Sequence, residues 1–340
     1  MSLSFAVFIV IVAVAAAVLA GVLILLLYPL MQRYALARPN ARSSHKVPTP
    51  QGGGAAVAAA GLLVAGLALH LAWQGPSPGF AGLALAVVVL ALSGAADDIR
   101  PLPVLPRLAI QFGAVTLAVT ALGDIRLFPD LLPATVERCL VIVSGVWFIN
   151  LVNFMDGLDW ITVAEVVPVT AALALFAVLG VMPADAGLLA AGLLGAMLGF
   201  APFNRPVARL FLGDVGSLPI GLILGILLYR LAGEGQFVAA VLLPLYYLAD
   251  ATLTLVMRLT RGEKVWEAHR SHFYQRATDN GFSVTGVVCS VFLLNLVLAA
   301  LAAASLVAPD PVARFGLFVA GMAAVTFLLI RFARPRVRAA

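Results

Sequence analysis

Charge is scarce in this 340-residue chain, since only 11% of its residues are charged whereas 63% are hydrophobic. A soluble domain carries about 25% charged and about 45–50% apolar residues, so the composition excludes an ordinary soluble globular protein. No polar stretch between the apolar runs is long enough to form a soluble domain of its own. With a mean hydropathy of +1.07, the chain is predicted to lie in a lipid bilayer.

Cysteine and histidine are also rare, with two and four residues respectively. Cys139 and Cys289 lie far apart in apolar segments, which excludes a disulfide framework and a metal site built on paired cysteines. The net charge of +5 comes from residues strung along the ends of apolar runs, so we expect no nucleic-acid partner. The first run begins at Phe5 without a basic segment and is too long for a signal peptide, so we expect a retained span.

Apolar runs of the length of a membrane span recur along the whole chain. About 20 helical residues cross the hydrocarbon core, where only a helix satisfies its own backbone hydrogen bonds. We therefore predict an all-α polytopic membrane protein with about eleven spans, ten being the alternative count, in a single domain of residues 1–340. The predicted spans are residues 5–30, 53–73, 79–95, 107–123, 136–153, 160–181, 185–202, 215–232, 236–257, 284–306 and 313–331.

Basic residues lie mainly on alternate connections between these spans. Seventeen of the 21 Lys and Arg residues fall on one side, and only Arg126, Arg138, Arg230 and Arg314 fall on the other. Loops on the cytoplasmic side of membrane proteins are rich in Lys and Arg. The asymmetry predicts an N-terminus outside the cell and a C-terminus in the cytoplasm.

The loops of the predicted cytoplasmic side also carry the unusual polar residues. Asp97, Asp98, Asp156, Asp159 and Asp214 all lie at predicted helix ends there. Like charges that share a site repel one another unless a cation lies among them. Oxygen ligands without cysteine favour Mg²⁺, with Mn²⁺ as the alternative, and Mg²⁺ completes its shell with water and substrate phosphates. The motif loops are residues 44–54, 97–107, 150–159, 204–217 and 258–283.

Groups suited to phosphate lie in the same loops. The glycine run 52–54 opens a span, and backbone N–H groups at a helix N-terminus bind phosphate. His269 and His272 share a face if their segment is helical, and with Arg270 and Lys46 they supply cationic donors for a diphosphate. The residues alone thus predict metal-dependent phosphoryl transfer to or from a lipid at the cytoplasmic interface.

Four motifs, in order and on one side of the membrane, resemble a known family. NLVNFMDGLDWI, FLGDVGS, the Asp97-Asp98 pair and HRSHFYQ are similar to motifs of the polyprenyl-phosphate N-acetylhexosamine-1-phosphate transferases. The resemblance runs from about Ser44 to Gln275. It implies transfer of a sugar 1-phosphate from a UDP-N-acetylhexosamine to undecaprenyl phosphate with release of UMP. It also implies an enzyme of the bacterial inner membrane with its active site facing the cytoplasm, and leaves a homodimer open.

The resemblance assigns roles residue by residue. Asp97 is the expected base for the lipid phosphate with Asp98 beside it, and Asp214 is the expected Mg²⁺ ligand. Phe211 is expected to stack on the uracil. The remaining residues expected to bind substrate are Lys46, Asn153, Asp156, Asp159, Asn204, His269, Arg270 and His272.

Two departures from the muramoyl-pentapeptide branch of that family bear on the donor sugar. Enzymes of that branch have a DDxxK pattern, and Pro101 stands here at the position of its lysine. They also carry a denser histidine cluster than HRSHFYQ. The HRSHFYQ form resembles the O-antigen-initiating branch, whose donors include UDP-GlcNAc and 6-deoxy sugars such as UDP-FucNAc and UDP-QuiNAc. The expected product is therefore a surface-polysaccharide precursor, with the phospho-N-acetylmuramoyl-pentapeptide transferase as the alternative.

Other classes of membrane protein fit the motifs less well. A secondary transporter binds its substrate near the bilayer midplane, often between internal repeats. Here the acids gather at helix ends on one side, and the DGxxAR signature of CDP-alcohol phosphotransferases is missing. Within the predicted spans, Asp250 and Glu165 remain open between a functional role and a helix-packing hydrogen bond.

Overall fold

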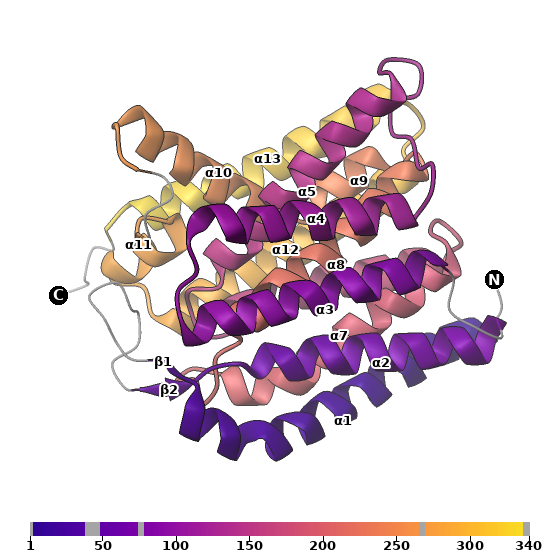
Figure 1. The fold of residues 1–340 in the computed structure, drawn as a ribbon. Helices are drawn as coiled ribbons and strands as arrows, with labels where there is room; N and C mark the ends of the chain where they lie inside the picture. The colour runs from indigo at the N-terminus through magenta and orange to yellow at the C-terminus, as the bar shows by residue number, and fades with distance from the viewer. Residues whose placement is uncertain (1–2, 38–47, 74–77, 265–268, 336–340) are drawn as a thin grey trace.

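The computed structural model describes residues 3–37, 48–73, 78–264 and 269–335, and all structural statements below concern these residues. They form thirteen helices and one two-stranded sheet (Figure 1). The elements are α1 (Leu3–Tyr34), β1 (Leu36–Ala37), β2 (Thr49–Pro50), α2 (Gly53–Trp73), α3 (Pro78–Ile99), α4 (Val104–Ala121), α5 (Ala134–Met155), α6 (Ile161–Val178), α7 (Ala184–Asn204), α8 (Asp214–Gly233), α9 (Phe237–Leu242), α10 (Leu245–Thr260), α11 (Phe273–Asp279), α12 (Val284–Leu306) and α13 (Pro311–Ala333).

The predicted all-α membrane fold is confirmed. Ten helices of the described chain are long and apolar enough to cross a membrane. They coincide with ten of the eleven spans predicted from the apolar runs, and helix ends differ by only a few residues. The apolar runs located the spans because length and hydrophobicity are local properties of the chain.

The ninth predicted span, residues 236–257, is not one continuous helix. Its sequence forms the short helix α9 and then α10, with Leu243 and Pro244 between them. Proline has no backbone N–H and its ring clashes with the carbonyl four residues earlier, so it favours a kink or a break in a helix. The chain therefore traverses the bundle here as two helical pieces.

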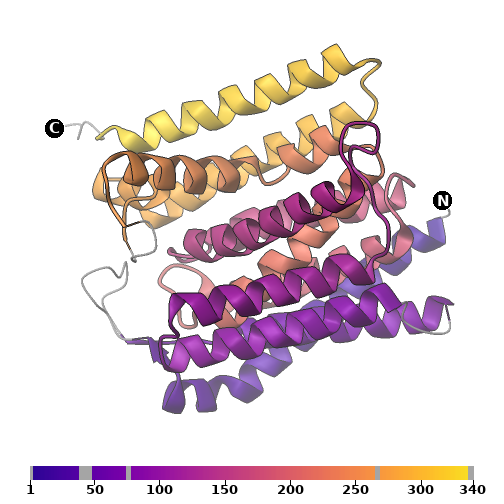
Figure 2. The same ribbon diagram turned by 45° about the horizontal axis from the view of Figure 1, so that its top comes forward.

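The helices lie side by side as a bundle, with α1 and α13 at opposite edges (Figures 1 and 2). The first helix begins and the last helix ends at opposite ends of this bundle, as expected for an odd number of crossings. Among the ten candidate spans, α6, α7 and α8 are the most buried, and they form its interior. The motif residues lie on helix ends at one end of the bundle more than on loops between helices.

Small residues let the interior helices approach closely. A Cβ added at Gly195 of α7 would lie 1.9 Å from the carbonyl oxygen of Ala13 in α1. At the motif end, a Cβ on Gly54 of α2 would lie 2.1 Å from the Cα of Gly216 in α8. Close backbone contact of this kind is the usual way that helices associate in a membrane. The FLGDVGS glycine Gly216 is thus explained first by packing.

A short backbone ribbon joins the first and fourth motif loops. Strands β1 and β2 pair antiparallel, with Leu36 opposite Pro50. The next residue after β2, Gln51, forms a parallel bridge with Phe211, and the Phe211 N–H donates to the Pro50 carbonyl at 2.8 Å. This ribbon places residues 49–54 against the FLGDVGS segment.

Arginines at the end of the bundle away from the motifs are mostly neutralised by acids. Arg126 pairs with Glu137 at 2.9 Å, Arg138 pairs with Asp124 at 2.6 Å, and Arg230 holds Asp185 through two hydrogen bonds. Three of the four basic residues predicted on that side are therefore ion-paired.

The contact between α2 and α8 generates a stability prediction. Gly54→Ala is expected to lower the thermal midpoint of the detergent-solubilised protein by several degrees, because its methyl group would overlap the backbone of Gly216. Gly21→Ala in α1 is the matched control, since nothing lies within 4 Å of an added Cβ there. Its midpoint should stay level or rise slightly, because alanine is the better helix former. Equal midpoints for the two variants would contradict this packing.

Candidate active site

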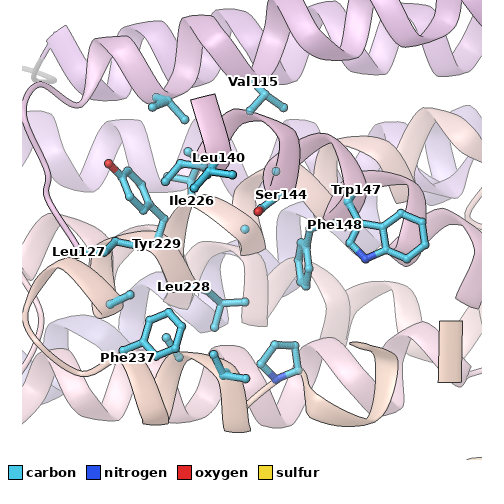
Figure 3. A pocket seen from close by; sticks show the side chains of 18 of the residues that line it. Val115, Leu127, Leu140, Ser144, Trp147, Phe148, Ile226, Leu228, Tyr229 and Phe237 are labelled. Atoms are coloured by element: carbon cyan, nitrogen blue, oxygen red, sulfur yellow. The ribbon is translucent and has the colours of Figure 1, made fainter. Parts of the chain in front are cut away.

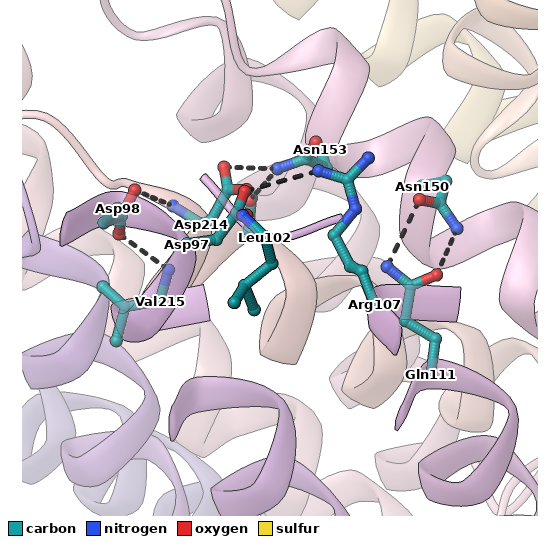
Figure 4. Close-up of polar contacts among 10 residues, drawn as sticks. Asp97, Asp98, Leu102, Arg107, Gln111, Asn150, Asn153, Asp214 and Val215 are labelled. Atoms are coloured by element: carbon teal, nitrogen blue, oxygen red, sulfur yellow. Dashed lines mark hydrogen bonds and ion pairs between the residues drawn. The ribbon is translucent and has the colours of Figure 1, made fainter. Parts of the chain in front are cut away.

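Helix α8 begins at the motif end of the bundle, and its first backbone N–H groups are held by another helix. The residue before it, Gly213, has no side chain to cap them and adopts a φ of +76°. The carboxylate of Asp98, at the end of α3, accepts hydrogen bonds from Asp214 N at 3.0 Å and Val215 N at 3.1 Å (Figure 4). Unpaired N–H groups at a helix start require such acceptors. Asp98 therefore fixes where α8 and Asp214 stand relative to α3.

Asp214 is held from a third helix as well. Asn153 of α5 donates from its side-chain nitrogen to Asp214 Oδ1 at 2.7 Å and to Ser217 Oγ at 2.8 Å. Asp97, next to Asp98 in α3, interacts electrostatically with the Asp214 carboxyl. The predicted acids of α3 and α8 thus meet at one point, although they lie more than 100 residues apart in the chain.

Asp97 also has partners of its own. Its Oδ1 accepts from the Leu102 N–H at 2.6 Å, and its Oδ2 pairs with Arg107 of α4 at 3.3 Å (Figure 4). One turn further along α4, Gln111 exchanges two side-chain hydrogen bonds with Asn150 of α5. A line of polar side chains therefore leads from the acid cluster into the space between α4 and α5.

Side chains of the third motif loop, residues 150–159, connect it to the fourth motif loop, residues 204–217. Asp159 Oδ2 accepts from Ala208 N at 2.9 Å. Asn204 accepts from Trp160 N at 2.7 Å and donates to the Leu210 carbonyl at 2.9 Å. Two residues predicted to bind substrate therefore also hold these two motifs in a fixed relation.

A polar pocket of about 290 Å³ opens where these elements meet. It gathers seven of the twelve predicted site residues, from the second, third and fourth motif loops. Asp97 lies beside the pocket without lining it, and Lys46 lies outside the described residues. The pocket is lined by Ala37, Gln51, Asp98, Asn153, Asp156, Gly157, Leu158, Asp159, Asn204, Phe211, Leu212, Gly213, Asp214, Gln275 and Val284.

The predicted phosphate contact by the glycine run 52–54 is wrong for two of its three N–H groups. Gly53 N donates to the Phe211 carbonyl at 3.0 Å, and Gly54 N donates to the Leu212 carbonyl at 2.9 Å. These bonds leave neither group for a ligand. The two glycines instead join α2 to the FLGDVGS segment.

The fifth motif loop, residues 258–283, contains HRSHFYQ and is called the fifth motif below. Asp250 of α10 holds this segment in place. Its carboxylate accepts from Phe273 N at 2.9 Å and Tyr274 N at 3.0 Å, so it caps α11 as Asp98 caps α8. His272 lies against the same carboxylate, with its Nδ1 at 3.3 Å from Oδ1, and is only 2% exposed. The role of Asp250, open from the sequence, is therefore at least to position this loop.

The histidines and arginine of the fifth motif lie outside the lining of the polar pocket. The rings of His269 and His272 lie 4.8 Å apart, although their segment is not helical as the predicted shared face assumed. Burial, and then the charges of His272 and Arg258, lower the pKa of His269 to about 4. Its ring is therefore neutral near pH 7 in the ligand-free protein, and its role in binding the diphosphate stays a prediction. Arg270 pairs with Asp279 at 3.2 Å.

Asp156 has an environment that opposes its charge. Burial, which outweighs a lowering hydrogen bond from Thr162, together with the charges of Asp98 and Asp159, raises the pKa of its carboxyl to about 7. A carboxyl with a pKa near 7 changes charge easily when a cation or phosphate arrives. Among the described residues, no group of three or more His, Cys, Asp and Glu side chains forms a preassembled metal site.

Two glutamines that line the pocket were not singled out from the sequence. Gln51 donates from Nε2 to the backbone carbonyl of Asp98 at 3.0 Å, and Gln275 projects from α11. Both stand inside motifs that the sequence displays, at the ends of HKVPTPQ and HRSHFYQ. Their position as uncharged polar residues at the ends of these two segments was the sequence feature that could have indicated them.

An apolar cavity of about 460 Å³ lies along the same helices, away from the motif end (Figure 3). Phe148 of α5 and Gly221 of α8 line it, whereas Asn153 and Asp214 of these two helices line the polar pocket. Side chains of α4, α9 and α10 complete its wall, among them Val115, Phe237 and Leu248. A polar pocket at the helix ends is thus followed by an apolar cavity deeper in the bundle.

Comparison with known proteins agrees with this geometry. A family model described as glycosyl transferase family 4 matches residues 80–232, which run from α3 through α8. The decaprenyl-phosphate N-acetylglucosaminephosphotransferase of Mycobacterium leprae is 28% identical, over 87% of this chain and 84% of the relative. The phospho-N-acetylmuramoyl-pentapeptide-transferase of Mycolicibacterium smegmatis is 29% identical, over 75% of this chain and 83% of the relative. Together these matches support the polyprenyl-phosphate N-acetylhexosamine-1-phosphate transferase family.

The apolar helices and these relatives support a multi-pass membrane enzyme of the glycosyl-1-phosphate transferase class. The matched segment contains the transferase's acid cluster and ends before the α11 motif. The individual roles expected for Asp97, Asp98, Asp214 and the substrate-binding residues stay predictions.

The raised pKa of Asp156 generates a prediction for the ligand-free transferase. A carboxyl that keeps its proton in the folded state to about pH 7 stabilises the fold at low pH, and this contribution is lost as pH rises through about 7. Asp156→Asn removes the titration and keeps the acceptor for Thr162. The thermal midpoint of the variant minus that of the wild type should therefore increase from pH 5 to pH 8, measured in chelator. A constant difference across this range would contradict the raised pKa.

Proposed function

We propose that this transferase moves an N-acetylhexosamine 1-phosphate from a UDP-sugar to undecaprenyl phosphate and releases UMP. The observation that carries the proposal is the presence of two cavities at different positions along the same helices, α5 and α8. The polar pocket suits a soluble nucleotide diphosphate sugar, and the apolar cavity suits an isoprenoid chain. A reaction between these two substrates needs both kinds of space on one scaffold.

The reaction takes place at the phosphorus that bears the sugar. An oxygen of the lipid phosphate bonds to the β-phosphorus of the UDP-sugar, the bond to the bridging oxygen breaks, and UMP leaves with that oxygen. Charge neutralisation and positioning supply most of the catalysis in such transfers. In this proposal Asp97 accepts the proton of the lipid phosphate, and Asp98 holds Asp214 in place beside it.

Mg²⁺, or Mn²⁺ in its place, is the cofactor of the proposal. Asp214 would hold it, and the crowding of Asp97, Asp98 and Asp214 favours a cation at that point. Mg²⁺ is usually held by one or two carboxylates and completed by water and substrate phosphates. Assembly with the diphosphate agrees with the lack of a preassembled metal site in the described chain. Bound there, the ion would neutralise charge on the diphosphate.

The donor sugar of the proposal is GlcNAc or a 6-deoxy relative such as FucNAc or QuiNAc. The N-acetylglucosamine-phosphotransferase named above supports the first of these. The muramoyl-pentapeptide transferase is the second candidate, because relatives of that name also match most of the chain. Pro101 and HRSHFYQ argue for the first class and for an early step of surface-polysaccharide synthesis.

The proposed location is the bacterial inner membrane with the polar pocket at its cytoplasmic face. The distribution of basic residues supports this orientation, because 17 of the 21 Lys and Arg residues belong to the motif side. A pocket that receives a UDP-sugar from the cytoplasm would open on that side.

A direct assay tests the proposed reaction. Membranes or purified protein are incubated with undecaprenyl phosphate and each labelled UDP-N-acetylhexosamine, including UDP-MurNAc-pentapeptide, with Mg²⁺ or with chelator. We expect a labelled lipid and UMP in the presence of Mg²⁺ only. The preferred donor separates the two candidate functions, and no labelled lipid with any donor would refute both.

Asp214→Asn tests the proposed metal ligand. It should lower turnover about 100-fold or more, because a positioned charge at the reacting phosphates is lost. Asp124→Asn makes the same chemical change at the opposite end of the bundle, where the Asp124 side chain is 90% exposed, and it should keep wild-type turnover. Near-normal turnover by Asp214→Asn in correctly inserted protein would rule out its metal role.

A further inference from the structure

Gln275 is a buried amide side chain with an unused acceptor. It is 7% exposed and lines the polar pocket from α11. Its Oε1 is buried and has no hydrogen-bond partner in the described structure. A buried acceptor without a partner is costly, so folded proteins rarely keep one unless a ligand or water supplies the donor. This atom therefore points to a ligand group that carries an N–H or O–H.

The surrounding chain holds Gln275 in place. Asp250 anchors the start of α11 through the N–H groups of Phe273 and Tyr274. The Tyr274 hydroxyl donates to the Phe154 carbonyl at 3.0 Å, which ties α11 to the end of α5. Two helices thus fix the turn from which Gln275 projects, so its direction is set before any ligand binds.

The third motif leaves room for this amide. A Cβ added at Gly157 would lie 2.9 Å from the Gln275 side-chain nitrogen and 2.2 Å from the Tyr274 hydroxyl. Only a glycine at position 157 lets α11 approach this closely. The glycine of MDGLD therefore makes space for the side chain that ends HRSHFYQ.

Gln275 is also what the fifth motif contributes to the pocket. Of the described residues of loop 258–283, it is the one that lines it, whereas His269, Arg270 and His272 do not. The charged residues that line the pocket are all acids. Gln275 adds a neutral group that accepts at Oε1 and donates at Nε2.

The chemistry of an amide restricts what it recognises well. A ligand that pairs with both atoms presents an N–H beside a C=O, as another amide or an imide does. A phosphate offers acceptors only and would leave Oε1 unpaired. A UDP-N-acetylhexosamine carries two suitable groups, which are the imide edge of uracil and the acetamido group of the sugar.

We propose that Gln275 binds the sugar-nucleotide donor through an amide or imide edge and so determines donor specificity. The proposal rests on the proposed transferase function and assigns Gln275 to binding, not to the chemical step. Its loss should therefore raise the KM for the donor and leave kcat almost unchanged, because the reacting phosphates are held by other residues.

Gln275→Met tests the assignment, because methionine has a similar length and no amide. We expect the KM for the preferred UDP-N-acetylhexosamine to rise about tenfold, as for the loss of buried hydrogen bonds, with kcat within about twofold. Gln236→Met makes the same change at the opposite end of the bundle, before α9, and should behave as wild type. Gln275→Asn is the second variant. It keeps the amide on a side chain that is one methylene shorter, so the amide lies further from the donor, and the KM should also rise.

Inhibition by UMP distinguishes the two groups of the donor. If Gln275 pairs with uracil, the inhibition constant of UMP rises by the same factor as the KM. If it pairs with the acetamido group, UMP inhibits the variant and the wild type equally, and discrimination against UDP-glucose falls. Either result supports the proposal.

Unchanged KM and unchanged UMP inhibition in folded Gln275→Met and Gln275→Asn would overturn it, as would a loss of kcat alone. Failure of the proposed function is a separate result, because the wild type and Gln236→Met would then form no labelled lipid with any donor. That outcome would remove the basis of this inference as well.

Discussion

The hydrogen bonds from the start of α8 to Asp98 are the constraint on which the site depends. They join α3 to α8 across 116 residues of sequence and place Asp214 at the first turn of a helix. The N-terminus of a helix carries partial positive charge, which favours carboxylates nearby. The same contact requires Gly213, where a Cβ would lie 2.6 Å from the Asp98 carboxylate, so the glycines and the acids of the motif form one unit.

The fifth motif uses the same arrangement a second time. Asp250 of α10 holds the first N–H groups of α11, and neither helix is capped by the side chain of its own preceding residue. Caps supplied by neighbouring helices make the position of each motif depend on tertiary packing. Asp159 and Asn204 act similarly between the third and fourth motifs. Several polar residues of this enzyme therefore hold the pocket together while they face it.

Charged side chains are arranged differently at the two ends of the bundle. At the end away from the motifs, Arg126, Arg138 and Arg230 are consumed by ion pairs that fix loops and helix ends. At the motif end, acids face a pocket and remain close to one another, an arrangement that a bound cation and a diphosphate would complete. The apolar cavity lies further along the bundle, so one pair of helices, α5 and α8, lines both environments.

The sequence by itself determined the class of fold, ten of the spans and the common side of the acidic motifs. Span length, hydrophobicity and alternation along the chain are local properties that do not depend on packing. The break in the ninth predicted span coincides with Pro244, although α1, α6, α7 and α8 continue through internal prolines. Recognition of the family followed from four short motifs in order. Only the tertiary structure decided which residues share a pocket, because that depends on contacts between distant helices. Contacts between helices occupy the N–H groups of Gly53 and Gly54, lower the pKa of His269 through burial, and place Gln275 at the pocket with its acceptor unpaired. None of these outcomes can be read from residue type and spacing, since each is set by which neighbour arrives from another helix.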